Sequence, residues 1–349
     1  MKRIFTYVWS GALFFALAAG AGCVKQGLDN RKNEGSVEIT LNWEGEKPAG
    51  SRIHFYPVVE DGTEPAESGE DVAADESVPV YRAVKGTASG WKGKLPVGKY
   101  RVIVYNSDDR LELRNEEDYE HAELALALEG SAANAGLPAS RVNECICQPD
   151  NVMLATKLDE PEDFDGTEYL LEVPFNDVVK VSASPKSILK YVDIDFKIEG
   201  DVFLTGGMLT GVSQAVCCQS LVCHTDCYSV QYTPESYSGE ESFDYKTRIA
   251  VLDVVSPNAG ATHMVHLTLH RNDTNSDDYT IAVSVTDQVR RYLAAQRGGK
   301  IPVGEALPLT IRLEMIGNVP SVSVDPWDNT GLGSGTIGNT SGSGSAGVQ

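Results

Sequence analysis

Basic residues are scarce in this sequence. It also lacks two patterns that are typical of phosphate-binding and nucleic-acid-binding proteins. The 349 residues include 29 Lys and Arg against 50 Asp and Glu, which gives a formal net charge of −21. There is no glycine-rich loop of the kind that holds phosphates, and no patch that combines basic with aromatic residues. A phosphate backbone repels such an acidic chain, so we expect no nucleic acid among its partners.

Long hydrophobic segments are also rare, and the clearest one lies near the start of the chain. The basic residues Lys2 and Arg3 precede a mainly apolar stretch at 4–19, and small residues then lead to Cys23. The stretch is shorter than the ~20 residues of a membrane-spanning helix, and no stop-transfer sequence follows it. The pattern predicts a signal peptide over residues 1–22.

The position of Cys23 directly after this segment predicts a bacterial lipoprotein. Diacylglycerol on the thiol and an acyl chain such as palmitate on the amino group would supply more than one hydrocarbon anchor, enough for stable membrane attachment. Residues 23–35 are then a lipidated linker. Gly20 stands where lipoprotein signals usually carry Leu, so ordinary cleavage that leaves Cys23 as a free thiol is the alternative. After cleavage the net charge would be −23.

Two further segments are interpreted from their composition. Residues 60–76 hold eight carboxylates and no Lys, Arg or His, which indicates a solvated loop. Calcium binding is the alternative there and at residues 163–166, but neither segment has the ligand spacing of a calcium loop. Residues 329–349 carry no charge and are rich in Gly, Ser, Thr and Asn, so we expect a flexible tail.

The rest of the chain has the pattern of an all-β protein. Val37, Ile39, Leu41 and Trp43 alternate with polar residues, as in a strand with one buried face. Residues 287–296 have the pattern of a helix, with an acid in the first turn and two glycines after the end. Many short strands and little helix predict antiparallel sandwiches. Further strands are predicted at residues 52–59, 91–94, 100–105, 192–198, 208–215, 247–255, 263–270, 279–285 and 309–316, while 123–130 fits a helix or a strand and 173–182 a strand or a linker.

Several short motifs resemble a known family. Residues 95–102, Leu-Pro-Val-Gly-Lys-Tyr-Arg-Val, resemble the LPxGxYxV strand of transthyretin-like and Cna-B-like β-sandwich modules. Together with residues 41–43 and 54–57, they resemble the fimbrillin-like lipoproteins of Bacteroidales, in particular the family DUF5119, which are similar to the anchor subunits of minor fimbriae. Segments that resemble the C-terminal domain of that anchor family lie at residues 206–208, 285–289 and 322–327.

The resemblance implies two tandem transthyretin-like β-sandwich domains, at residues 36–183 and 184–328, with the lipid on Cys23 holding a base subunit in the outer membrane. In such fimbriae a strand of one subunit completes the open sheet edge of its neighbour, so the expected partners are fimbrial subunits. Adhesion of this kind needs no catalytic residue and no cofactor, and we do not expect an enzyme. Residues 24–32 lack the acidic cluster that commonly accompanies surface export in this phylum, so the surface and the periplasmic face of the membrane both stay open.

Six cysteines follow Cys23, and three interpretations of them stay open. An exported compartment and an even number favour disulfides, although the sequence cannot choose between the pairings. Unpaired thiols are the second interpretation. Zinc binding is the third, because His224 lies among the thiols, but the paired Cys-x2-Cys spacing of common zinc sites is absent. The six residues are Cys145, Cys147, Cys217, Cys218, Cys223 and Cys227.

Three histidines lie close together on a predicted strand. His266 and His270 share one face of that strand and His263 points to the other, so the three cannot converge on one metal ion. We therefore expect them to face solvent or pack against the sheet, and we predict no metal site.

The leading hypothesis is a membrane-anchored fimbrial anchor, assembly or adhesion subunit. The alternative is a surface glycan-binding lipoprotein that accompanies a polysaccharide-uptake system and stacks exposed aromatic residues on sugar rings. Trp43, Trp91 and Trp327 are expected to lie in cores or interfaces instead. An enzyme ranks third, because no nucleophile–base pair or carboxylate pair stands at a usable spacing.

Overall fold

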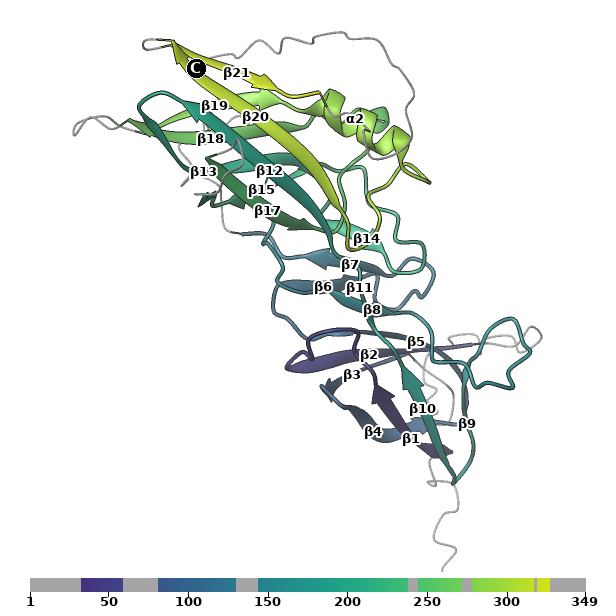
Figure 1. Ribbon diagram of the computed structural model, residues 1–349. Helices are drawn as coiled ribbons and strands as arrows, with labels where there is room; N and C mark the ends of the chain where they lie inside the picture. The colour runs from purple at the N-terminus through teal and green to yellow at the C-terminus, as the bar shows by residue number, and fades with distance from the viewer. Residues whose placement is uncertain are drawn as a thin grey trace, which may run out of the picture.

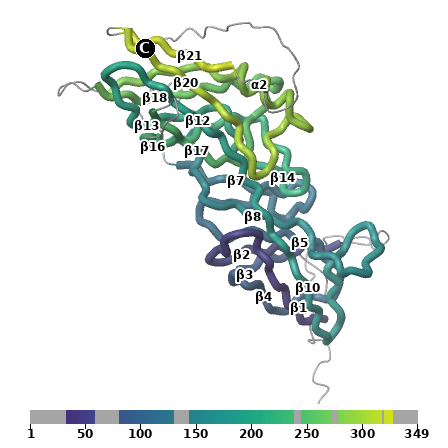
Figure 2. Tube along the Cα trace, viewed as in Figure 1, coloured from purple at the N-terminus to yellow at the C-terminus, as the bar shows by residue number. Residues whose placement is uncertain are grey.

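The computed structural model describes residues 33–58, 81–129, 144–237, 244–271, 278–316 and 319–326. Strands dominate these residues, which confirms the all-β prediction. Figures 1 and 2 show an elongated molecule with the first strands at its lower end and the last strands at its upper end. Within the described residues, no helix is both long and apolar enough to cross a membrane.

A nine-stranded sheet forms the lower half of the molecule (Figure 1). Strand β1 (Glu34–Leu41) pairs antiparallel with β4 (Gly90–Pro96) and parallel with β10 (Val178–Ala183). Val37 and Ile39 are buried as their alternation predicts. The strand order is β10-β1-β4-β3-β2-β5-β8-β11 with β9 beside β5, and the other members are β2 (Gly50–Pro57), β3 (Arg82–Thr87), β5 (Gly98–Asn106), β8 (Met153–Ala155), β9 (Leu171–Val173) and β11 (Lys186–Ser187).

Strand β5 shows how this half packs. Tyr100 and Val104 point into a hydrophobic cluster that includes Phe55. The rings of Phe55 and Tyr100 pack edge to face, with their centroids 6.4 Å apart. Ile103 and Tyr105, on the opposite face of the same strand, belong to a larger cluster that continues into the upper half. The sheet is therefore buried on both faces along β5, which agrees with the nearly continuous apolar run in that strand.

A three-stranded sheet lies between the two halves. Its strands β6 (Leu111–Arg114) and β7 (Glu123–Leu126) precede the predicted domain limit at 183/184, and β14 (Ala215–Cys217) follows it. Residues 123–130, which fit a helix or a strand, thus contain the central strand of this sheet. The two domain ranges remain a proposal, and the pairing of β7 with β14 joins them by backbone hydrogen bonds.

Two sheets that face each other form the upper half. Their inner faces bring together Phe196 and Leu309 from one sheet with Val230 and Leu267 from the other. Strand β12 (Lys190–Glu199) pairs antiparallel with β17 and parallel with β20. The orders are β16-β17-β12-β20-β21 and β15-β13-β18-β19, with β13 (Val202–Val212), β15 (Tyr228–Tyr232), β16 (Glu235–Ser236), β17 (Tyr245–Val251), β18 (Met264–Arg271), β19 (Tyr279–Ser284), β20 (Ala306–Ile316) and β21 (Val319–Val324).

Helix α2 (Thr286–Ala295) lies beside the start of β20 and agrees with the predicted helix to within one residue at each end. Asp287 lies in its first turn, and Gly298 and Gly299 adopt positive φ angles just after it. The Tyr292 hydroxyl donates to the Ala306 carbonyl at 3.1 Å, which fixes the helix to β20. A short 3-10 helix, η3 (Pro257–Ala259), contacts α2.

Candidate functional site

Several predicted features lie outside the described residues. These are the signal peptide at 1–22, Cys23 with the segment that follows it to residue 32, the acidic segment at 60–76 and the tail at 329–349. The described chain begins at Asn33, at the lower end of the molecule (Figure 2). The candidate sites below are therefore sheet edges, cavities and side-chain clusters of the folded part.

The two facing sheets of the upper half end on the same side. β19 is the last strand of one sheet and β21 is the last strand of the other, and the two strands contact each other. Among the described residues, no further strand pairs with either of them. β21 carries Pro320, which has no N–H and is typical of an edge strand, whereas β19 contains no proline.

The outer edge of β19 presents backbone groups that can pair with another strand. The Val285 N–H donates to the His263 carbonyl at 2.9 Å, on the side of β18. Backbone N–H groups alternate in direction along a strand, so the N–H groups of the odd-numbered residues of β19 point toward β18. The N–H groups of Thr280, Ala282 and Ser284 consequently face away from the sheet. This edge can accept a strand from a partner.

The hairpin that joins β20 and β21 carries exposed apolar side chains at its end. Ile316 and Val319 are opposite each other in the register and are 63% and 64% exposed. The β20–β21 hairpin lies at the upper end of the molecule (Figure 1), and β21 contacts β19.

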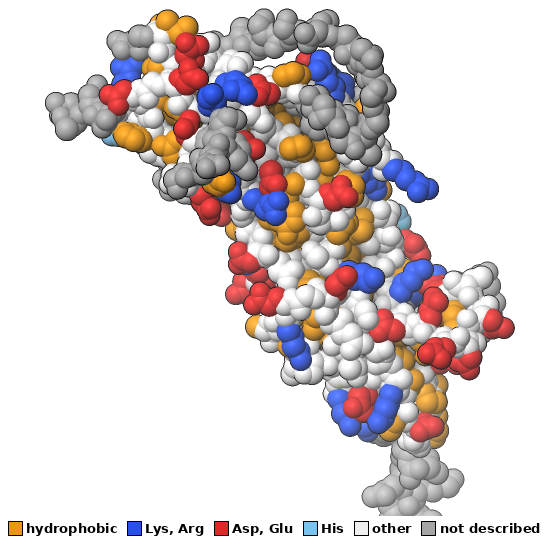
Figure 3. Space-filling view, viewed as in Figure 1, with side chains coloured by type: hydrophobic (Ala, Val, Ile, Leu, Met, Phe, Trp, Pro, Cys, Tyr) orange, Lys and Arg blue, Asp and Glu red, His pale blue; other side chains and the backbone are white. Residues whose placement is uncertain are grey.

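The edge of the lower half differs from this one. β10 is the outermost strand there, but the Asp159 N–H donates to the Ser182 carbonyl at 2.8 Å and the Ser184 hydroxyl donates to the Asp159 carboxylate at 3.0 Å. Phe175 and Val178 are about half exposed near the start of β10. The segment that follows Asp159 projects from the side of the lower half, and Figure 3 shows acidic side chains gathered on this projection.

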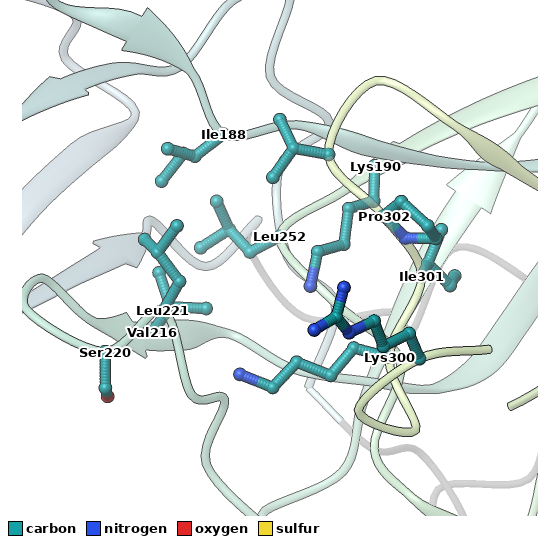
Figure 4. A pocket seen from close by; sticks show the side chains of 11 residues that line it. Ile188, Lys190, Val216, Ser220, Leu221, Leu252, Lys300, Ile301 and Pro302 are labelled. Carbon is teal, nitrogen blue, oxygen red and sulfur yellow. The ribbon is translucent and has the colours of Figure 1, made fainter.

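A cavity of about 380 Å³ lies where the upper half meets the three-stranded sheet. Three cationic residues line it: Lys190 at the start of β12, and Arg297 and Lys300 in the loop after α2. Figure 4 shows the amino groups of Lys190 and Lys300 turned toward the same space. The walls are otherwise mainly apolar and include Ile188, Val216, Leu221, Leu252, Ile301 and Pro302.

Lys190 is held in a buried ion pair behind this cavity. Its Nζ lies 2.5 Å from Oδ2 of Asp253, and the two side chains are 4% and 3% exposed. The Val254 N–H donates to Oδ1 of Asp253 at 2.9 Å. Burial raises the pKa of Asp253 and the positive charge of Lys190 opposes that shift. The pair is satisfied internally, so its geometry indicates a structural role.

The six cysteines of the folded part are free thiols in this structure. Cys145 is buried with its sulfur 3.7 Å from that of Met208. Burial raises the pKa of Cys218 to about 12 and that of Cys223 to about 11, so both are protonated at neutral pH. The disulfides that the compartment favours remain a prediction for the oxidised protein.

The three histidines of the predicted strand are distributed as their spacing requires. His266 and His270 lie on the outer face of β18, where Nδ1 of His270 is 2.9 Å from Asp278. His263 is fully buried against Gly211, which has a φ of 87° and no room for a Cβ atom. Burial lowers the pKa of His263 to about 4. Within the described residues, no group of three or more His, Cys, Asp or Glu side chains is placed to hold a metal ion.

Three aromatic residues that a sugar-binding site could use, Trp43, Trp91 and Tyr232, are engaged in packing or hydrogen bonds, while Trp327 lies outside the described residues. The Trp43 indole donates to the Ala88 carbonyl at 2.7 Å, and the Trp91 ring lies 5.3 Å from that of Phe55. A second, polar cavity of about 790 Å³ is lined in part by Asp193, Gln231 and Tyr232. Its aromatic member Tyr232 is 5% exposed and donates to a backbone carbonyl, so it offers no open ring face.

Sequence reasoning missed two features of these sites. The cavity cations Arg297 and Lys300 follow the helix, and nothing in the sequence places them beside Lys190. The open side at β19 depends on the strand order of two sheets, which local patterns do not encode. The sequence signal nearest to this edge is that residues 279–285 contain no proline and no inward charge. Central strands share that feature, so it does not identify an edge strand.

Comparison with known proteins gives relatives that are described as fimbrial anchor subunits or adhesins. No family model matches the chain, so the narrower assignment to DUF5119 stays a prediction. The chain is 26% identical over 168 residues to the "putative fimbrium anchoring subunit Fim4B" of Bacteroides ovatus, a match that covers 46% of this chain and 44% of that protein. The match thus spans less than half the length of this curated relative.

One solved structure shows the same fold, and a second is less similar to the chain. A "putative adhesin" from Bacteroides ovatus superposes with a TM-score of 0.50 at 16% identity, covering 85% of this chain and 95% of that one. The fimbrial anchor protein Mfa2 from Porphyromonas gingivalis gives a TM-score of 0.41 at 13% identity, with 84% and 98% covered. The resemblance that the motifs indicate is therefore confirmed: the chain is similar in sequence to a Bacteroides fimbrium anchoring subunit and shares the all-β fold of a Bacteroides adhesin.

Proposed function

We propose that this chain is a lipid-anchored fimbrial anchor or assembly subunit of the outer membrane, which binds a partner subunit by β-strand addition at β19. The observation that carries the proposal is the open outer edge of β19, at the end of the molecule opposite the N-terminal strands (Figure 1). The similarity to a fimbrium anchoring subunit supports the same assignment. The proposal includes no catalytic step and no cofactor.

Lipidation at Cys23 supplies the fixed end in this proposal. Ten positions separate Cys23 from Asn33, where the described chain begins. A fully extended chain of this length spans at most about 35 Å, so the lower end of the molecule would stay close to the membrane. The upper end, with β19 and the β20–β21 hairpin, would then face away from the lipid.

Strand addition at β19 follows from the physics of sheet edges. The outward N–H groups of Thr280 and Ala282, with the neighbouring carbonyls, can continue the antiparallel or parallel ladder with a strand from another subunit. Main-chain pairing provides affinity, and the alternating side chains of the incoming strand provide specificity. The adjacent surface at Ile316 and Val319 offers apolar contact to the same partner.

A proline substitution tests the edge without changing its surroundings. Ala282→Pro removes one outward N–H and leaves the hydrogen bonds to β18 in place, whereas Ala282→Ser keeps the N–H. We expect Ala282→Pro to weaken co-purification with fimbrial subunits in detergent by about tenfold or more, and Ala282→Ser to leave it unchanged. Thermal unfolding of each variant checks that the fold is retained. If wild-type protein stays monomeric in cells with intact fimbriae, strand addition is wrong.

Lipidation has its own test. Cys23→Ser prevents acylation, so the mature protein should move from the detergent phase to the aqueous phase in a detergent partition experiment. Mass spectrometry of the N-terminal peptide should find a diacylglycerol-linked cysteine in the wild type. A wild-type protein that begins with an unmodified Cys23 would support ordinary cleavage instead.

The glycan-binding alternative has less support from the geometry. Its site would need exposed aromatic faces, but Trp43, Trp91 and Tyr232 are engaged in packing and hydrogen bonding. Retention on immobilised polysaccharide by wild-type protein would favour that alternative.

A further inference from the structure

The cavity at the junction between the upper half and the three-stranded sheet is built from segments far apart in the sequence. It takes Lys190 from the start of β12, Val216 from β14 and Leu252 from the end of β17. The loop after α2 closes one side with Lys300 and Ile301. Its volume of about 380 Å³ lies within the range of small-molecule sites in proteins.

The charge of the cavity is opposite to that of the protein. The chain has a net charge of −21, yet Lys190, Arg297 and Lys300 all line this space. The nearby carboxylate of Asp253 forms its ion pair with Lys190. Within the described chain, neither Arg297 nor Lys300 has a salt bridge or side-chain hydrogen bond. Among the described residues these two cations thus have no salt-bridge partner, although the charge of Lys300 also acts on the Asp253 carboxylate.

The opposite wall of the cavity has different chemistry. Leu221 and Leu252 face the amino groups of Lys190 and Lys300 across the space in Figure 4. Leu252 is 1% exposed, and Ile301 on the loop side is also 1% exposed. A ligand that fits here needs a negative group at one end and an apolar body at the other.

We propose that this cavity binds a small amphipathic carboxylate. The carboxylate would lie between Arg297 and Lys300, where charge-assisted hydrogen bonds are stronger than neutral ones. The apolar body would lie against Leu221 and Val303, two apolar lining residues that stay partly exposed, and gain from the area it removes from water. The site shares no residue with the β19 edge, so it goes beyond the proposed anchor function and does not depend on it.

Titration calorimetry with three probes tests the ligand class on the full mature chain. Octanoate has both the carboxylate and the apolar body, octan-1-ol has the body alone, and inorganic phosphate has the charge alone. We expect octanoate to bind at one site, and the two other probes to bind at least about tenfold more weakly. Equal binding of octan-1-ol or of phosphate would overturn the proposal, as would no binding of octanoate.

Variants then locate the site. Arg297→Gln and Lys300→Gln should each weaken octanoate binding by about fivefold, as expected for loss of one partly exposed charged hydrogen bond. Arg291→Gln is the matched control, because Arg291 is an exposed cation on α2 that does not line the cavity. All three side chains are at least partly exposed, so the fold should be retained, which thermal unfolding checks. If Arg291→Gln weakens octanoate binding as much as Arg297→Gln and Lys300→Gln do, octanoate does not bind at this cavity.

Discussion

In each half of this molecule one strand lies between an antiparallel and a parallel neighbour, but the edge strands of the two halves differ. In the lower half β1 lies between antiparallel β4 and parallel β10, and in the upper half β12 lies between antiparallel β17 and parallel β20. In the lower half the parallel strand is itself the edge, and the chain covers part of it at Asp159. In the upper half β21 extends the sheet further, and the facing sheet ends at β19. From the same strand plan, the lower half thus ends in an edge that the chain partly covers, whereas the upper half ends in β21 beside the open edge of β19.

This difference suggests a division of roles along the molecule. The lower half holds the start of the folded chain, and its edge strand already has hydrogen bonds from the chain itself. The upper half has two sheets that end on one side, next to the exposed hairpin residues Ile316 and Val319. Open edges normally risk unwanted pairing, so their retention at one end favours a use for them.

The largest expected effect compares a buried ion pair of the upper half with an exposed one of the lower half. Asp253→Asn leaves the Lys190 charge buried without its partner and should cost about 3–5 kcal/mol of unfolding free energy. Lys92→Gln breaks the exposed pair with Glu38, whose atoms approach to 3.5 Å, and should cost under about 1 kcal/mol. Denaturant unfolding measures both values. Similar losses for the two variants would contradict this contrast.

The next prediction compares two buried histidines. The pKa of His54 in the lower half and of His263 in the upper half is about 4, mainly because burial disfavours the charged ring. The unfolded chain binds more protons between pH 6.5 and 4, so each histidine should reduce stability as the pH falls through this range. The loss should approach about 3 kcal/mol for each of them.

Leucine substitutions separate the two histidines. Nδ1 of His54 lies 2.7 Å from the Tyr81 hydroxyl, whereas the ring nitrogens of His263 make no hydrogen bond of good geometry among the described residues and only approach the backbone of Gly211 and Val255. At pH 7 His54→Leu should therefore lower the unfolding free energy by about 1–3 kcal/mol, and His263→Leu should change it less. Both variants should flatten the dependence of stability on pH. A pH dependence identical to that of wild type would show that the histidine concerned does not cause it.

The smallest effects on stability are expected at the two ends of the molecule. Phe175→Ser with Val178→Ser changes the lower end, and Ile316→Ser with Val319→Ser changes the upper end. All four side chains are at least half exposed, so each double variant should stay within about 1 kcal/mol of wild type. Only the upper pair should reduce binding of a fimbrial partner. Equal loss from both pairs would remove the distinction between the two ends.

The sequence was sufficient for elements that depend on local pattern. The alternation at Val37 and Ile39 predicted β1, and the first-turn acid Asp287 with the glycines after the end predicted α2 to within one residue. The burial of His263 behind a strand whose other histidines face outward also follows the period of two. These features depend on near neighbours in the chain, which the sequence displays directly.

The remaining features depend on contacts between distant segments. Residues 173–182 were ambiguous because the identity of β10 as a sheet strand depends on parallel pairing with β1, more than a hundred residues earlier. The three-stranded sheet and the cavity at Lys190 have the same origin, since each combines segments from separate parts of the chain. No local pattern specifies which strand becomes an edge, so the open side at β19 required the structure.

Amide hydrogen exchange of the acylated protein, with and without a bound fimbrial subunit, tests the central claim most directly. If a partner strand pairs with β19, exchange at the outward amides of Thr280 and Ala282 should slow strongly on binding, while exchange along β10 stays unchanged. Unchanged exchange at β19 in a complex that has formed, or protection at β10 instead, would contradict the account.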